Sequence, residues 1–175
     1  PASLLVMAVG IRPHVEPAKS SGLVVERGIV VDDQMRTSDP DIFAMGDCTV
    51  QDWNGARVRL ESVQNAVDQA EAVAAVLAGG HEPYRPKPWF WSDQGPMKLQ
   101  MAGLSFGADR HVRLGALGEP AFSVYHYTGD RLLAVDSVNR PGDHMVARRL
   151  IASGISPTDA DLAEGPERLK SLIGR

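Results

Sequence analysis

The sequence is poor in cysteine and lacks the glycine spacing that binds dinucleotides. Its 175 residues contain one cysteine, Cys48, which excludes an intrachain disulfide, a CxxC redox pair and four-cysteine ligation of an iron–sulfur cluster. No two of its 17 glycines lie two positions apart, so neither GxG nor GxGxxG occurs. Any electrons that this chain moves must therefore be carried by an organic cofactor or by a partner. A single cysteine also fits a reducing cytoplasm.

Charge and hydrophobicity exclude two further classes of partner. The net charge is −4, and the lysines and arginines are scattered among carboxylates, which argues against nucleic acid as a partner. No apolar run approaches the roughly 18 to 20 residues that span a bilayer, so no membrane segment is predicted. The histidines show no HxH or HxxxH spacing suited to a metal. They are His14, His81, His111, His126 and His144.

The first half of the chain has the pattern of an α/β unit. Apolar residues 3–9 predict a buried strand of a parallel sheet, and residues 28–31 and 42–45 predict two shorter strands. A helix is predicted over residues 63–78, with Ser62 as its N-cap and two glycines as its stop. Apolar residues on one face of this helix, at steps of four and three, are Val63, Val67, Ala70, Ala74 and Leu77.

The second half has the pattern of an α+β unit. Residues 81–88 contain three prolines and read as a linker, so we expect one domain over residues 1–86 and another over residues 87–175. Beyond the linker, alternating strands and two helices predict an antiparallel sheet with helices packed on it. The expected strands are residues 98–104, 112–114, 121–127 and 132–138, and the expected helices are residues 143–153 and 167–173.

Three stretches carry residues suited to a cofactor. In TSDPDIFAMGDC (residues 37–48), a strand would deliver Gly46 and Asp47 to the carboxyl edge of the sheet. Gly46 would allow close approach of the backbone to a ligand, and Asp47 could accept hydrogen bonds from polyol hydroxyls. The alternative is that Asp47 only braces a turn.

The second stretch is RLESVQNAVDQA (residues 59–70). The helix start at Ser62, Val63 and Gln64 offers free backbone N–H groups and a partial positive charge, which suit an anionic acceptor. The alternative is that this helix start binds nothing. In the third stretch, PWFWSDQGPMKLQMAGL (residues 88–104), consecutive aromatics either dock two domains or wall off a flat ring system.

Together, in this order and spacing, the three stretches resemble the FAD-dependent reductases that pass electrons from NAD(P)H to ferredoxins. The resemblance implies that Asp47 meets the ribityl chain of FAD and that Val63 and its neighbours lie under the flavin ring. It also implies that Trp91 lies near the isoalloxazine. The opening LLVMAVGIRP resembles the last strand of the family's NAD-binding domain. The expected fold is thus an α/β remnant of an FAD/NAD(P)-binding Rossmann-like domain, followed by an α+β C-terminal reductase domain.

The same resemblance implies the reaction. Hydride would pass from NAD(P)H to FAD, and single electrons would pass on to a ferredoxin that serves an oxygenase. The family's two GxGxxG fingerprints would lie upstream of Pro1, so we interpret the chain as part of a longer polypeptide that is inactive alone. The alternatives are a non-catalytic docking module, or a related flavoenzyme such as an NADH oxidase or a nitrite reductase flavin domain. Exposed apolar strand edges around Leu4, Leu5 and Val6 would favour homo-oligomers.

Overall fold

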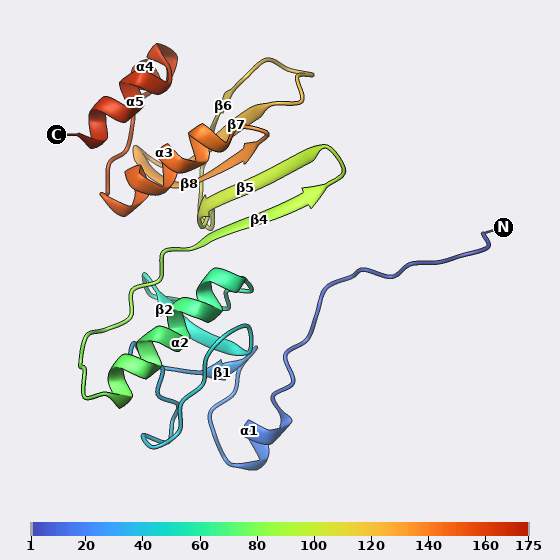
Figure 1. Ribbon diagram of the computed structural model, residues 1–175, viewed down its shortest axis with the longest axis vertical. Coiled ribbons are helices and arrows are strands. Elements are labelled where there is room, and N and C mark those ends of the chain that lie inside the picture. Colours follow the sequence, from blue (N-terminus) through green and yellow to red (C-terminus); the bar gives the residue numbers. More distant parts are fainter. Residues whose placement is uncertain (1, 175) are drawn as a thin grey trace. The chain divides into compact units, whose positions relative to one another are not determined.

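The chain divides between Arg85 and Pro86, within the proline-rich stretch. The computed structural model describes residues 2–174, and its two compact units are Pro1–Arg85 and Pro86–Arg175. Figure 1 shows the helices and strands of both units. Each unit has its own cluster of buried hydrophobic residues.

The first unit is built on a small mixed sheet of order β1-β2-β3. Strand β1 is parallel to β2, whereas β2 and β3 form an antiparallel hairpin. The hairpin turns at Asn54-Gly55, where φ is positive at both residues (51° and 82°), as a type I′ turn requires. This hairpin was not predicted from the sequence, although Asn-Gly is a strong turn signal. The elements are α1 (Glu16–Ser20), β1 (Ile29–Val30), β2 (Thr49–Trp53), β3 (Ala56–Val58) and α2 (Val63–Leu77).

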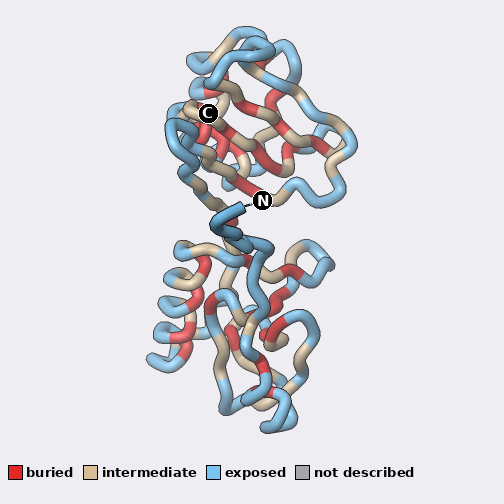
Figure 2. Tube along the Cα trace, turned by 90° about the vertical axis from the view of Figure 1, so that its right-hand side faces the viewer, coloured by how far each residue is buried: buried red, intermediate tan, exposed pale blue. Residues whose placement is uncertain are grey.

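Helix α2 confirms the predicted helix. Ser62 is extended at the N-cap, and its Oγ accepts a hydrogen bond from the Asn65 N–H at 3.1 Å. The apolar face noted in the sequence is the exposed one, however: Val63 is 65% and Leu77 70% exposed. Buried residues follow the other side of the helix, as Figure 2 shows. They are Asn65, Gln69, Val73 and Val76. Asn65 and the side-chain oxygen of Gln69 have hydrogen-bond partners inside the unit, whereas Gln69 Nε2 has none among the described residues.

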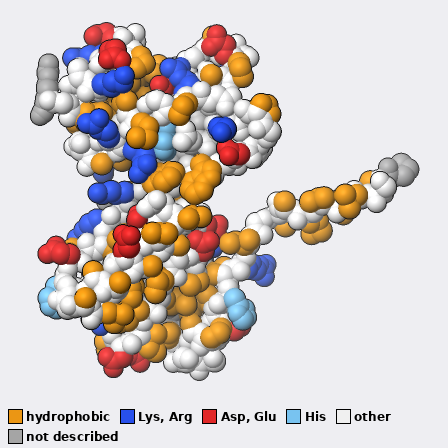
Figure 3. Space-filling view, viewed as in Figure 1, with side chains coloured by type: hydrophobic (Ala, Val, Ile, Leu, Met, Phe, Trp, Pro, Cys, Tyr) orange, Lys and Arg blue, Asp and Glu red, His pale blue; other side chains and the backbone are white. Residues whose placement is uncertain are grey.

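Two predicted strands are wrong, and one is confirmed. Residues 3–9 form no strand, and their apolar side chains are exposed (Figure 3), Leu5 to 81%. A strand needs a neighbour to complete its hydrogen bonds, and no described strand pairs with this segment. Residues 42–45 make only an isolated bridge between Phe43 and Arg36. The strand predicted over residues 28–31 is present as β1.

The second unit is a five-stranded antiparallel sheet of order β4-β5-β8-β7-β6 with three helices. The four predicted strands and two predicted helices are confirmed with shifted ends, whereas β4 and α4 were not predicted as elements. The strands are β4 (Trp89–Gln94), β5 (Met97–Gly103), β6 (Arg110–Leu114), β7 (Phe122–Thr128) and β8 (Arg131–Val138). The helices are α3 (Pro141–Ala152), α4 (Asp159–Glu164) and α5 (Pro166–Ile173).

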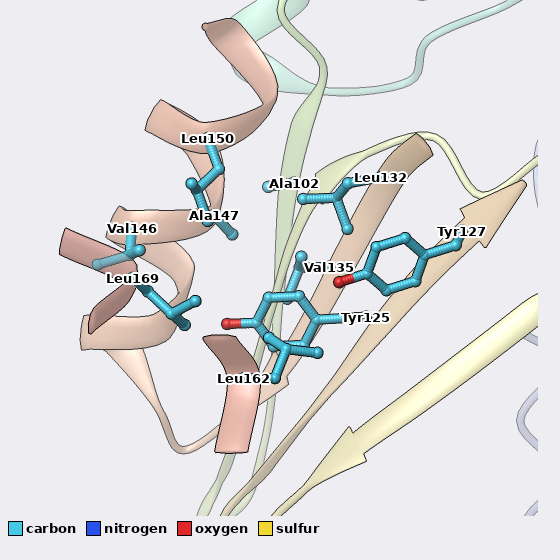
Figure 4. Close-up of a cluster of buried hydrophobic side chains, with 10 residues drawn as sticks. All are labelled: Ala102, Tyr125, Tyr127, Leu132, Val135, Val146, Ala147, Leu150, Leu162 and Leu169. Carbon is cyan, nitrogen blue, oxygen red and sulfur yellow. The ribbon is translucent and has the colours of Figure 1, made fainter. Parts of the chain in front are cut away.

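One face of this sheet packs against the helices. Tyr125 and Tyr127 of β7 are fully buried there, together with Leu150 of α3 (Figure 4). The Tyr127 hydroxyl donates to the Pro157 carbonyl at 2.9 Å, which satisfies its buried oxygen. Because side chains alternate along a strand, His126 points to the opposite face. The second unit therefore has one helix-covered face and one face with polar groups on it.

Candidate functional site

The Gly46-Asp47 turn does not follow a strand, as the sequence suggested, but precedes β2. Gly46 has φ +83°, and its N–H donates to the Gln69 side-chain oxygen at 2.6 Å. The Gly46 carbonyl accepts from the backbone and hydroxyl of Thr49 at 3.0 and 2.8 Å. Residues 42–45 lack a neighbouring strand, so hydrogen bonds to α2 and β2 position this turn instead.

The turn lies directly against the start of α2. A Cβ placed on Gly46 would be 3.7 Å from the Cβ of Ala66, and the positive φ would strain any other residue there. Asp47 is exposed, and its backbone carbonyl accepts from the Arg59 guanidinium at 3.4 Å, while its carboxylate has no hydrogen-bond partner in the part of the chain that the structure describes. The fold thus brings together residues 37–48 and 59–70, which are separate stretches of the sequence, and it leaves Asp47 exposed to solvent.

The first turn of α2 has unused hydrogen-bond donors. Ser62 accepts from Asn65 through its side chain and from Ala66 through its carbonyl, but among the described residues the N–H groups of Val63 and Gln64 have no partner. The first turn contains no acidic residue that would offset the positive end of the helix dipole. This helix start is therefore suited to an anionic or carbonyl acceptor.

Two buried polar residues, neither of them predicted as a site residue, support this turn and helix. Gln69 is fully buried and accepts from Gly46 and, at 3.2 Å, from the Thr49 hydroxyl. Asn65 donates to the Leu60 carbonyl at 3.2 Å, and its side-chain oxygen accepts from the Tyr84 hydroxyl at 3.3 Å. Asn65 and Gln69 are four residues apart, so they lie on the same side of α2. That spacing was the one sign in the sequence that the two side chains act together.

Replacing Gln69 by leucine should loosen the Gly46 turn. The variant would leave the Gly46 N–H without its acceptor, and it should lower the free energy of unfolding of the first unit by about 1–3 kcal/mol. Urea denaturation measures that loss, and amide hydrogen exchange at Gly46 should become faster. Glu71→Leu, at an exposed position of the same helix, is the control. An equal loss of stability in both variants would show that the Gly46–Gln69 hydrogen bond does not stabilise the first unit.

In the second unit, the consecutive aromatics lie in the edge strand β4. Trp89 pairs with Ala102 in β5, and its ring lies 5.3 Å from that of Trp91. The guanidinium of Arg148 from α3 lies 4.5 Å from the Trp89 ring centre, a cation–π distance. Trp91 is 47% exposed, so it has surface available for a ligand.

Behind Trp89 lies a buried histidine, His144 of α3. Its ring centre is 5.8 Å from that of Trp89, it is 1% exposed, and neither ring nitrogen has a hydrogen-bond partner within residues 2–174. Burial, and then the charge of Arg148, hold the pKa of His144 below its ordinary value of 6.5. His144 is therefore neutral in the folded protein near neutral pH and acts as a packing residue beneath Trp89.

The lowered pKa predicts acid-sensitive stability. Above about pH 6.5, His144 is neutral both folded and unfolded; as the pH falls below that value, the unfolded chain binds the proton first and the folded state loses stability. The free energy of unfolding should therefore fall by at most about 1.4 kcal/mol per pH unit from this group.

Urea titrations from about pH 8 to about pH 5, followed by tryptophan fluorescence, test this dependence. His144→Phe should remove that part of the acid loss, because phenylalanine binds no proton, while His81→Phe at an exposed position should retain it. Parallel pH profiles for wild type and His144→Phe would contradict the assignment.

Comparison with known proteins places these features in a family. The family described as pyridine nucleotide-disulphide oxidoreductase matches residues 1–70, and the one described as reductase C-terminal matches residues 89–173. Rhodocoxin reductase of Rhodococcus erythropolis is 48% identical over 99% of this chain, and putidaredoxin reductase CamA of Pseudomonas putida is 41% identical over 99%. The chain is similar to the FAD-dependent ferredoxin reductases over nearly its whole length. It matches their C-terminal part and spans about two fifths of the length of these two relatives (41% and 42%).

Solved structures of ferredoxin reductases agree with this fold. The reductase of the covalent putidaredoxin reductase–putidaredoxin complex superposes with a TM-score of 0.91 at 39% identity, covering 99% of this chain and 43% of that one. The ferredoxin reductase for the CYP199A2 system from Rhodopseudomonas palustris gives a TM-score of 0.89 at 44% identity, covering 95% and 42%. The expected resemblance and fold class are confirmed, and the family's cofactors are FAD and NAD(P)H. Within residues 2–174, no helix has both the length and the apolar character needed to cross a membrane.

Proposed function

We propose that this chain forms the flavin-ring side of the FAD site in an NAD(P)H:ferredoxin reductase. The observation that carries the proposal is the start of α2, where two backbone N–H groups lack partners beside a glycine turn. A reduced flavin carries negative charge at its N1–C2=O edge, and preorganised N–H donors with the helix dipole stabilise such charge. The donor set of the first unit therefore fits FAD.

Each residue of this site has a distinct proposed part. Val63 and Gln64 would donate their backbone N–H groups to the flavin ring, with Ser62 holding the helix start in place. Asp47 would accept hydrogen bonds from the ribityl hydroxyls, and Gly46 would let the backbone approach. FAD, when bound, supplies the change from two-electron to one-electron transfer, whereas the protein contributes orientation and electrostatics.

Trp91 is proposed as an aromatic neighbour of the isoalloxazine. Its half-exposed ring has a π face available for stacking, and its partner Trp89 is held by Arg148 and His144. A rigid aromatic beside the flavin would exclude water and define one wall of the electron-transfer site. The role rests on the family resemblance together with this exposure.

The proposed electron acceptor is a ferredoxin that serves an oxygenase. Among the relatives are the ferredoxin–NAD(+) reductase component of the anthranilate 1,2-dioxygenase system of Burkholderia cepacia (41% identical) and the ferredoxin reductase subunit of 5,5'-dehydrodivanillate O-demethylase from Sphingobium (36%). The chain has one cysteine and holds no iron–sulfur cluster by itself, so an iron–sulfur partner would receive the electrons one at a time.

The chain alone should bind FAD only weakly. A dinucleotide is held mainly by its pyrophosphate on a glycine-rich turn, and this sequence has no GxG. The remaining contacts contribute on the order of 1–3 kcal/mol each and must first offset the lost freedom of the ligand, which leaves a dissociation constant of about 1 mM or weaker. Gel filtration after incubation with excess FAD, followed by an absorbance spectrum, measures retention. A stoichiometric yellow complex would show a more complete pocket than we propose.

A chimera tests the site residues in an active enzyme. The C-terminal part of rhodocoxin reductase would be replaced by this chain, and NADH-dependent reduction of a ferredoxin would be measured. Asp47→Ala should weaken FAD retention by about tenfold, the effect of one charge-assisted hydrogen bond. Asp41→Ala, which removes another exposed carboxylate of the same segment, should leave retention unchanged.

Trp91→Ala in the same chimera should slow ferredoxin reduction while FAD stays bound. The proposed function fails if the wild-type chimera folds, binds FAD and still reduces no ferredoxin. The role of Asp47 fails separately if Asp47→Ala and Asp41→Ala retain FAD equally.

A further inference from the structure

Two histidines far apart in the sequence meet on the second unit. Strands β6 and β7 are antiparallel, and their register places His111 directly opposite His126. The two Nδ1 atoms are 2.9 Å apart, and the rings meet edge to face with centres 5.0 Å apart. The two histidines are 15 residues apart in the sequence and meet only because their strands pair. A search for HxH or HxxxH spacing therefore does not find them.

A carboxylate orients the inner histidine. The Nε2 atom of His126 lies 3.0 Å from Asp136 Oδ2, and the His126 side chain is only 13% exposed. His126 pairs with Ala134 and Asp136 pairs with Val124, so the His126–Asp136 contact is a diagonal one between neighbouring strands. With its Nε2–H donated to Asp136, neutral His126 presents the lone pair of Nδ1 toward His111.

From this arrangement we propose that His111 and His126 form a binding site for a divalent transition-metal ion. In the empty site, His111 donates its Nδ1–H to His126; in the loaded site, the ion replaces that proton between the two nitrogens. The His111 proton then moves to its own Nε2, on an exposed side chain. Two imidazole nitrogens at about 2.0–2.1 Å from a tetrahedral ion lie about 3.3 Å apart, so the pair needs to open by only a few tenths of an ångström.

The donors select the class of metal. Imidazole nitrogen suits Zn²⁺, Cu²⁺ and Ni²⁺ rather than Ca²⁺ or Mg²⁺. A metal-binding histidine usually donates its other N–H to a carboxylate, and Asp136 already accepts it here. Arg113 lies on the same face of β6 as His111. Its guanidinium lies over the Phe122 ring at 4.3 Å and donates to the Ala116 carbonyl, and these contacts hold the side chain in place.

The proposed site is open. No three histidine, cysteine or acidic side chains within the described part of the chain are arranged to hold a metal together. Water or an incoming ligand would complete the coordination of the ion. This arrangement differs from a closed structural zinc site, in which four protein ligands surround the metal. The site therefore predicts reversible binding rather than a metal on which folding depends.

Titration of the full chain with Zn²⁺ by isothermal calorimetry tests the site. Wild type should bind one ion saturably, and His111→Gln or His126→Gln should abolish that binding. Asp136→Asn should weaken Zn²⁺ binding by about tenfold, because the Asp136 carboxylate orients the His126 ring but does not itself bind the ion. His14→Gln and His81→Gln, which change exposed histidines in the first unit, should bind like wild type.

Two results would overturn the proposal. One is the absence of saturable Zn²⁺ binding up to about 1 mM. The other is saturable binding that survives both His111→Gln and His126→Gln, which would mean adventitious binding elsewhere. Circular dichroism checks that the variants fold. If His126→Gln does not fold, His111→Gln, which changes an exposed side chain, still tests the site. Ni²⁺ should give the same pattern of variants.

Discussion

The hydrogen bonds of the Gln69 side chain hold the candidate site together. This fully buried side chain accepts from the Gly46 N–H and the Thr49 hydroxyl, and so joins the glycine turn, the start of β2 and the middle of α2. A buried donor left unpaired costs about 1–3 kcal/mol, so the turn has little freedom to move away from the helix. The open donors of Val63 and Gln64 and the carboxylate of Asp47 are held near one another for this reason.

The second unit uses its two sheet faces differently. The helix-covered face buries Tyr125 and Tyr127, which pack in one apolar cluster with Leu150 of α3. His144 and Arg148, also on the helix side, hold Trp89 and leave its neighbour Trp91 half exposed. On the opposite face, His126 lies between His111 and Asp136. Side-chain alternation along β7 lets one strand serve the core and a polar surface at once.

The reported likeness and these contacts support one another. The stretches that resemble ferredoxin reductases are those that form the glycine turn, the helix start and the aromatic strand. The contacts show what these residues do there: Gly46 adopts the positive φ of the turn, and the Ser62 cap leaves the first two N–H groups of the helix without partners among the described residues. The exposed apolar residues 4–7 and the outer stripe of α2 belong to surfaces that the described residues do not cover.

The sequence by itself determined the local features of this protein: helix α2 with its serine cap, four strands of the second unit, and the motifs that predicted an FAD-dependent ferredoxin reductase. These depend on short-range periodicity, capping and turn chemistry, which neighbouring residues contain. Tertiary structure alone decided which face of α2 is buried, that residues 3–9 are not a strand, and that His111 lies against His126. Each of these depends on partners distant in the chain, because burial and strand pairing are completed only by packing.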